Sequence, residues 1–435
     1  MIAYHQVRAD RFEALASGLG GPAAVRQLAS AQHSKHLLLL RFLTDAYSGA
    51  PGRGDAVDVL VRAARRDPDR VADLMTDPMV GAWAVRTTRR LAGHGEAHAT
   101  PIADDLAQVG ALAAAAALRT GQDAELGTRT LAGTVTLPTL GSAVLGSDGP
   151  AVVTITAGQA TITGDRAKVE SGGDDPRWRE LRRLVTAHGE LVGSLAVEDG
   201  NPYRDCYHAP PAGRLPAEEV RQWQELFSEA WQLLAQWAPA RAAELAAGLR
   251  SVVPLVAEDD GMARSGTARD AFGTLGLTRP HTAAELAVTL VHEFQHSKLS
   301  GLLDLVPLYR PDGAERHFAP WRADARPTGG LIQGVYAFLG VADTWRCLRS
   351  APGLEKRATR EFATVREQVA AGLAALEGSS ELTVKGRDFS AGIRSAVNEL
   401  SGEKLVKSTV ATAVVTLDRL RSSWRRRHPD HASRG

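Results

Sequence analysis

The sequence predicts a mainly α-helical protein with a small β module, and three observations support this fold class. Apolar residues recur at three- and four-residue spacing over residues 10–120 and again from Ala217 onward, as in helices that pack on a core. Over residues 133–197 apolar residues instead alternate with threonine, which is typical of half-buried strands. Apolar residues make up 44% and charged residues 23% of the 435 residues, enough for a large buried core.

The first part of the chain, residues 1–130, is expected to form a helical domain. Glycines and the pair Asp67-Pro68 separate its helices, because both residue types interrupt helical periodicity. Trp83 is most simply a core anchor of this domain. The predicted helical segments are residues 12–19, 24–43, 56–64, 71–75 and 104–118.

A small β-containing module is expected over residues 131–210. Gly158 lies between two alternating segments, and a hairpin is the natural interpretation. A turn-rich stretch, DGNPYRDCYHAPPAG, follows the last predicted strand. The predicted strands are residues 134–137, 151–157, 159–164 and 191–197.

The remainder, residues 211–435, is expected to be a mainly helical domain. Its helical pattern begins at Ala217 and returns in residues 361–376 and 391–420. Residues 267–277 are predicted to form an extended edge strand, and a predicted helix within residues 280–305 follows it.

Composition excludes several classes of protein. Lys and Arg total 51 and Asp and Glu total 50, so the chain lacks the basic excess of a nucleic-acid or anionic-membrane binder. Two cysteines, Cys206 and Cys347, cannot form a disulfide framework or a CxxC site. No signal peptide and no apolar run of 18 residues is visible, which predicts a cytoplasmic protein without a membrane span.

Residues 280–305 contain the motif His292-Glu293-Phe294-Gln295-His296 on a predicted helix. Thr282 and Glu285 form a capping box that marks the helix start. Four residues advance a helix by about 400° and about 6 Å, so both imidazoles leave the same face and can bind one divalent metal. Glu293 projects about 100° away and suits a water bound to that metal better than the metal itself.

This HExxH motif predicts a zincin-like α+β catalytic half. The ionisable groups would be costly in an otherwise apolar helix without partners, although a chance match with two core histidines is the structural alternative. Leu299 and Leu302 occupy the positions where a metzincin has Gly and a third His. Gln333, near the start of a Gly-rich helix, is the candidate third ligand through its amide oxygen.

The blocks LVHEFQHSKLSGLLDLVPL and APWRADARP, together with DGNPYRD and SGTARDAFG, carry a family resemblance. The chain resembles the HExxH-motif proteins found beside ribosomal peptide natural-product genes in actinobacteria, which are 2-oxoglutarate-dependent peptide β-hydroxylases. The resemblance extends over nearly the whole chain. It implies an Fe(II) enzyme that uses 2-oxoglutarate and O₂, with His292 and His296 as iron ligands.

The distal carboxylate of a bound 2-oxoglutarate would need a cation, for which Arg is best suited. Arg322 and Arg326 in APWRADARP are the preferred candidates, although Arg322 could instead stack on Trp321 or both could form salt bridges to Asp324. Arg269 is a third candidate. Ser265 and Thr267 are possible hydroxyl donors, and Lys298 is another cation that could attract the carboxylate.

Three functions are therefore open at this point. The resemblance implies hydroxylation of the β-carbon of a residue in a ribosomally made precursor peptide. The motif alone is equally that of a zinc metallopeptidase, in which Glu293 is the catalytic base. The third is a non-catalytic peptide-binding protein with a metal site. No nucleic-acid or membrane partner is expected, and the sequence predicts no oligomeric state.

Overall fold

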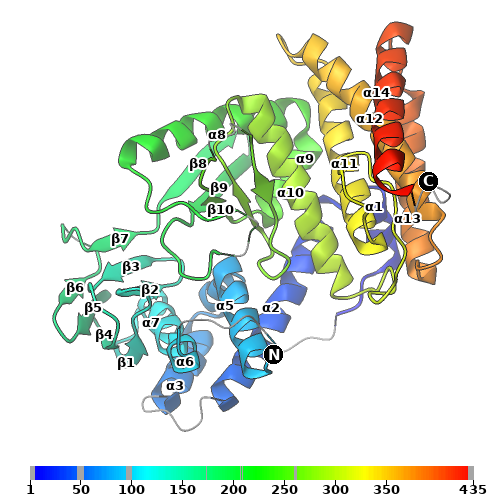
Figure 1. The fold of residues 1–435 in the computed structure, drawn as a ribbon. Coiled ribbons are helices and arrows are strands. Elements are labelled where there is room, and N and C mark those ends of the chain that lie inside the picture. Colours follow the sequence, from blue (N-terminus) through cyan, green and yellow to red (C-terminus); the bar gives the residue numbers. More distant parts are fainter. Residues whose placement is uncertain are drawn as a thin grey trace.

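The structure, a computed structural model, describes residues 5–46, 53–94, 100–172, 174–205, 207, 209–258 and 262–429. Within these residues the chain is mainly helical and contains three small sheets (Figure 1). The predicted fold class, mainly α with a small β component, is confirmed at this level. The domain limits stay a prediction, because the cores described below are shared between parts of the chain that are far apart in sequence.

The N-terminal part is helical, as predicted. Asp67 and Asp77 each precede a proline at the first helical position, and their carboxylates accept main-chain N–H groups of the first turn. The last helix of this part, residues 108–120, is followed by Gly121, whose φ of 65° lies in the left-handed region. The helices are α1 (Ala9–Ala16), α2 (Gly21–Ala46), α3 (Arg53–Arg66), α4 (Pro68–Met75), α5 (Pro78–Leu91), α6 (Ile102–Leu106) and α7 (Gln108–Thr120).

Two antiparallel sheets follow. One contains β1 (Ala124–Arg129), β4 (Pro150–Thr156), β5 (Gln159–Gly164) and β6 (Lys168–Glu170), and the other β2 (Thr134–Leu137), β3 (Gly141–Val144) and β7 (Trp178–Glu180). The predicted hairpin at Gly158 is confirmed: β4 and β5 are antiparallel, and Ala157 and Gly158 have φ of 51° and 80°. These sheets share a core with α3 to α7.

The third sheet is mixed and has the order β11-β12-β10-β9-β8. Its strands are β8 (Arg183–His188), β9 (Leu191–Val197), β10 (Ser251–Pro254), β11 (Ser265–Gly266) and β12 (Thr274–Leu277). Helices α8 (Ala217–Trp237) and α9 (Pro239–Gly248) connect β9 to the parallel strand β10.

The prediction of one edge strand over residues 267–277 is wrong in its extent. Only the last four of these residues form a strand, β12, and it lies inside the sheet between β10 and the edge strand β11. The main-chain N–H of Ala271 donates to the carbonyl of Ala268, which closes a turn, and Gly273 has a φ of 83°. This turn and the left-handed glycine interrupt the extended backbone.

The C-terminal part consists of long helices. They are α10 (Ala283–Leu303), α11 (Thr328–Leu348), α12 (Glu355–Glu377), α13 (Val384–Gly402) and α14 (Lys407–Arg427). The single helix predicted over residues 391–420 is wrong, because residues 403–406 separate α13 from α14. No helix in the described part of the chain is long and apolar enough to span a membrane.

Helix α10 occupies the middle of the molecule, between the mixed sheet with α8 and α9 on one side and α11 on the other (Figure 1). Leu286, Leu290 and Phe294 share a core with α8, α9 and the sheet. Leu299 and Leu302 share a second core with α1, α11, α12 and α13. The helix that carries the motif is therefore fixed by both halves of the surrounding structure.

Candidate metal centre

The start of α10 is set by Thr282, as the capping box predicts. Its hydroxyl accepts the main-chain N–H of Glu285 at 3.3 Å. In a capping box the glutamate side chain also accepts the main-chain N–H of the cap residue, here Thr282. The Glu285 carboxylate instead accepts the N–H of the preceding residue, His281, at 3.2 Å. The cap fixes where the first turn begins and hence which face of α10 the downstream residues occupy.

His292 and His296 lie side by side on one face of α10. Their ring centroids are 4.9 Å apart with an angle of 82° between the ring planes. Over residues 291–300 these two are the only residues that are not buried. The His292 side chain is 21% exposed. The two imidazoles are thus the accessible groups of an otherwise buried helix segment.

Burial, and then the neighbouring His296, lowers the pKa of His292 to about 4, while Glu293 opposes this shift. The imidazole of His292 is therefore neutral at pH 7. A neutral imidazole keeps the nitrogen lone pair that a metal needs.

Helix α11 places Gln333 directly beside His296. The amide oxygen of Gln333 lies 2.9 Å from Nδ1 of His296, and its amide nitrogen donates to the Ser300 hydroxyl at 3.4 Å. An amide oxygen only accepts, so with this amide orientation Nδ1 carries the proton and Nε2 is left for a metal. As placed, Gln333 orients His296. Direct ligation, as the sequence suggests, would require its oxygen to leave Nδ1.

Glu293 is buried, and both of its carboxylate oxygens accept hydrogen bonds. The hydroxyl of Ser265 donates to Oε1 at 2.7 Å. The single hydroxyl hydrogen of Thr267 is shared between Oε2, at 2.7 Å, and the Glu293 carbonyl, at 2.8 Å. Oε1 lies 3.9 Å from Nε2 of His292. The two hydroxyls suggested for the oxoacid thus hold Glu293 beside the histidine pair instead.

Two aromatic rings line the side of His292. Phe338 packs edge-on against His292, with centroids 4.9 Å apart, and Trp321 stacks on Phe338 at 4.7 Å. A Cβ at Gly334 would lie 2.4 Å from Nε1 of Trp321, so the stack needs a glycine there. Sequence reasoning missed Phe338, because a phenylalanine in an apolar helix looks like any core residue.

The three candidate arginines lie in different environments. Arg326 forms an ion pair with Asp324 at 3.1 Å, and its Nε lies 3.0 Å from where a Cβ of Gly330 would be, in the turn of α11 that precedes Gln333. Arg322 also pairs with Asp324 at 3.1 Å, and its side chain is 57% exposed. Both salt bridges to Asp324 that the sequence suggested are therefore formed.

Arg269 lies near the C-terminal end of α10. Its guanidinium is 3.9 Å from Asp304, and its side chain is 63% exposed. Asp304 follows His296 by two helical turns, so this contact directs Arg269 away from the histidines. Arg326 is accordingly the candidate that packs on the helix presenting Gln333.

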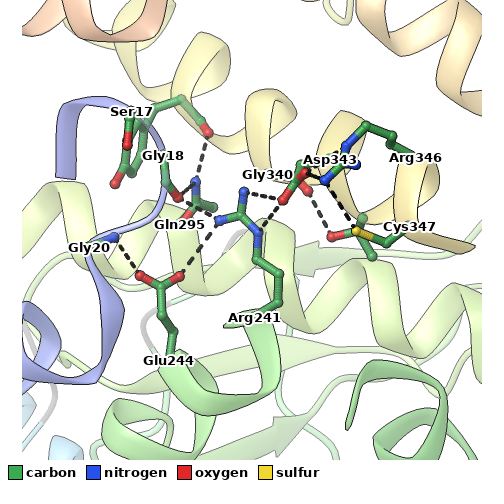
Figure 2. A network of polar contacts seen from close by, with 12 residues as sticks. Ser17, Gly18, Gly20, Arg241, Glu244, Gln295, Gly340, Asp343, Arg346 and Cys347 are labelled. Carbon is green, nitrogen blue, oxygen red and sulfur yellow. Dashed lines mark hydrogen bonds and ion pairs between the residues drawn. The ribbon is translucent and has the colours of Figure 1, made fainter. Parts of the chain in front are cut away.

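A buried network of charges lies on another face of α10. Lys298 is fully buried and pairs with both oxygens of Glu244 at 2.8 and 2.9 Å, so it is committed to α9 and cannot receive an oxoacid. Burial lowers the pKa of Lys298 to about 8, although Glu244 opposes the shift. Figure 2 shows Arg241 between Glu244 and Asp343 of α11, with the Gly18 main chain beside them.

The donor groups at the motif are the imidazoles of His292 and His296, the amide of Gln333, and the carboxylate of Glu293, whose two oxygens accept hydroxyl hydrogen bonds. Among the described residues, no group of three or more His, Cys, Asp or Glu side chains is placed to hold a metal ion. No protein-family model matches the chain, and no curated protein is significantly similar to it.

Proposed function

We propose that the protein is an iron(II)- and 2-oxoglutarate-dependent oxygenase that hydroxylates the β-carbon of a residue in a ribosomally made precursor peptide. The observation that carries the proposal is the pair of accessible imidazoles, His292 and His296, on one face of a buried helix, with the amide of Gln333 beside them. Two protein nitrogens leave coordination positions open for a chelating oxoacid and for O₂.

The residues around the motif suit this chemistry. A ferrous ion held by the two histidines would supply oxidation of a C–H bond to an alcohol by O₂, as 2-oxoglutarate is converted to succinate and CO₂. Gln333 holds the orientation of His296, and Phe338 with Trp321 shields the side of His292 from water. The guanidinium of Arg326 would receive the distal carboxylate of the oxoacid in a bidentate contact.

The edge of the mixed sheet offers a place for the peptide. β11 is the edge strand, and Ser265 within it donates to Glu293 next to the histidines. An edge strand carries main-chain groups on its open side, so an extended peptide can pair with it as an added strand. This pairing would bring the peptide to the exposed face of His292 and His296.

A zinc peptidase is the second candidate, and the 3.9 Å between Glu293 and His292 favours it. In a peptidase Glu293 would be the base that activates zinc-bound water. Both carboxylate oxygens already accept hydroxyl hydrogen bonds, and this favours an orienting role for Glu293. Its substitution therefore separates the two functions.

The experiment is anaerobic loading with Fe(II), followed by O₂, 2-oxoglutarate and candidate precursor peptides. Succinate release and a peptide mass gain of one oxygen are expected, and both should be absent in His292→Ala but kept in the control His188→Ala, which changes an exposed histidine. Glu293→Gln should retain part of the succinate release. Amide-bond cleavage by the zinc form, abolished in Glu293→Gln, would contradict the proposal and establish the peptidase. Peptide binding that survives His292→Ala, without turnover in any form, would indicate a non-catalytic binder.

A further inference from the structure

A cavity lies between the sheet β2–β3–β7 and the turn that follows β9. Its volume is about 50 Å³, enough for a group of a few heavy atoms. Neither His292 nor His296 lines it. The lining groups that matter here are Thr136, Ser142, Arg179, Glu198, Asn201 and Arg214.

Glu198 is the unusual member of this set. It directly follows β9, where its main-chain N–H donates to the carbonyl of Val252 at 2.9 Å, and it is only 3% exposed. Across the described residues its carboxylate makes no hydrogen bond and no ion pair, although it borders the cavity. A buried carboxylate without a partner is costly, so it calls for an explanation.

The neighbouring carboxylate shows the contrast. Asp199 is equally buried, but it accepts from the guanidinium groups of Arg182 and Arg214 and from the main-chain N–H of Leu215 at 3.1 Å. Asp199 therefore holds the turn together. Glu198 makes no such contacts and borders the cavity.

No positively charged group of the described chain is in direct contact with Glu198 to stabilise its ionised form. Burial raises the pKa of Glu198 well above its ordinary value, and the carboxylates of Asp77 and Asp199 raise it further. Arg204 and Arg183 oppose this shift from a greater distance than an ion pair. A cation in direct contact would stabilise the ionised carboxylate far more.

The other lining groups suit a donor of N–H bonds. The hydroxyls of Thr136 and Ser142 share one hydrogen bond at 3.0 Å and leave lone pairs for further donors. Arg214 is already committed to Asp199 and to the carbonyl of Glu180 at 2.8 Å. Arg179 is exposed, so water and salt screen the repulsion between its guanidinium and a bound cation.

We propose that this cavity binds a single ammonium or guanidinium group, with Glu198 as its counter-ion and the Thr136 and Ser142 hydroxyls as additional acceptors. This inference is independent of the metal chemistry. The chemistry is shared by a free small amine and by a lysine or arginine side chain of a peptide. Because the cation replaces a proton on Glu198, its affinity rises with pH.

The test uses the full chain and calorimetric titration. Methylammonium and methylguanidinium represent free small cations, and the acetylated amides of lysine and arginine represent peptide side chains. At least one probe should bind ten-fold more weakly to Glu198→Gln than to the wild type, while Glu125→Gln, which changes an exposed carboxylate of β1, should bind it normally. The stronger pair of probes identifies the source of the cation.

Melting temperature gives a second readout that does not need a ligand. Glu198→Gln replaces a buried carboxyl group that makes no hydrogen bond to the residues that the structure describes with a neutral amide of similar size, so the free variant should melt no lower than the wild type. A lower melting temperature would show that Glu198 has a structural partner and would overturn the proposal. Equal binding to both proteins, absence of binding by every probe, or binding of phosphate that is lost in Arg179→Gln would also overturn it.

Discussion

The amide oxygen of Gln333 lies 2.9 Å from Nδ1 of His296, which joins α10 to α11 across 37 residues of sequence. This contact determines which imidazole nitrogen is available at the candidate metal centre. It also explains why an amide is useful beside the motif, since a group that accepts at Nδ1 leaves Nε2 free.

Gln333→Ala should weaken Fe(II) binding by about 10- to 100-fold, the usual effect of removing a partner that orients a metal-binding histidine. The variant leaves both histidines in place, so the iron stoichiometry should stay unchanged while the dissociation constant rises. Anaerobic titration measures both quantities. The control Gln159→Ala changes an exposed amide of β5, and unchanged affinity in Gln333→Ala would remove Gln333 from the centre.

The buried pair Lys298–Glu244 should be strongly coupled. Glu244→Gln removes the acidic partner of the buried Lys298, so it should lower the free energy of unfolding by about 3–5 kcal/mol. Lys298→Met should lower it less, because Arg241 still lies 3.6 Å from Glu244. The double variant should lose clearly less than the sum, because neither charge is then left unpaired. Urea denaturation measures these free energies.

An exposed pair provides the comparison for this cycle. Arg221 and Glu218 on α8 form an ion pair with side chains 64% and 55% exposed. Their coupling should be about 0–1 kcal/mol. Additive losses at Lys298 and Glu244 would mean that this ion pair does not hold α9 against α10.

Protein stability should fall in mild acid because of His36. Burial lowers the pKa of His36 to about 4, and its Nδ1 lies 2.6 Å from the Met75 carbonyl. Between pH 6.5 and 4 the unfolded chain binds a proton at this position that the folded chain does not, so stability is lost as pH falls through this window. The loss approaches roughly 3 kcal/mol near pH 4 and vanishes above pH 6.5.

His36→Asn keeps an N–H donor near Met75 and removes the titration. Its free energy of unfolding should therefore vary less between pH 4 and 6.5 than that of the wild type, when both are measured by denaturant at fixed ionic strength. His188→Asn, which changes an exposed residue of β8, should keep the wild-type slope. Equal slopes in all three proteins would show that His36 is not the group responsible.

Local signals in the sequence predicted the elements that depend on local physics. The threonine alternation around Gly158 predicted the β4–β5 hairpin, and Thr282 marked the start of α10. In the mixed sheet only β9, predicted over residues 191–197, was found in this way. Strands β10 and β12 are four residues long and fully buried, and their parallel pairing joins segments that carry no pattern of their own.

The same distinction holds at the candidate site. Helical spacing alone placed His292 beside His296, because both lie on one element. The partners of Lys298 and Glu293 come from other elements, and nothing in the sequence ranks Glu244 or Ser265 above other groups of the same type. Arg322 and Arg326 could not be separated from sequence either, since their difference lies in how they pack against α11.

The most direct test of the metal centre is equilibrium dialysis of the chain against Fe(II) and 2-oxoglutarate without oxygen, with bound iron and bound oxoacid measured together. One equivalent of each should bind per chain, and either His292→Ala or His296→Ala should abolish iron binding and the iron-dependent part of oxoacid binding, while the helix content stays unchanged. Retention of iron by both single variants, with oxoacid binding that does not depend on iron, would contradict the assignment of these two histidines as the metal ligands.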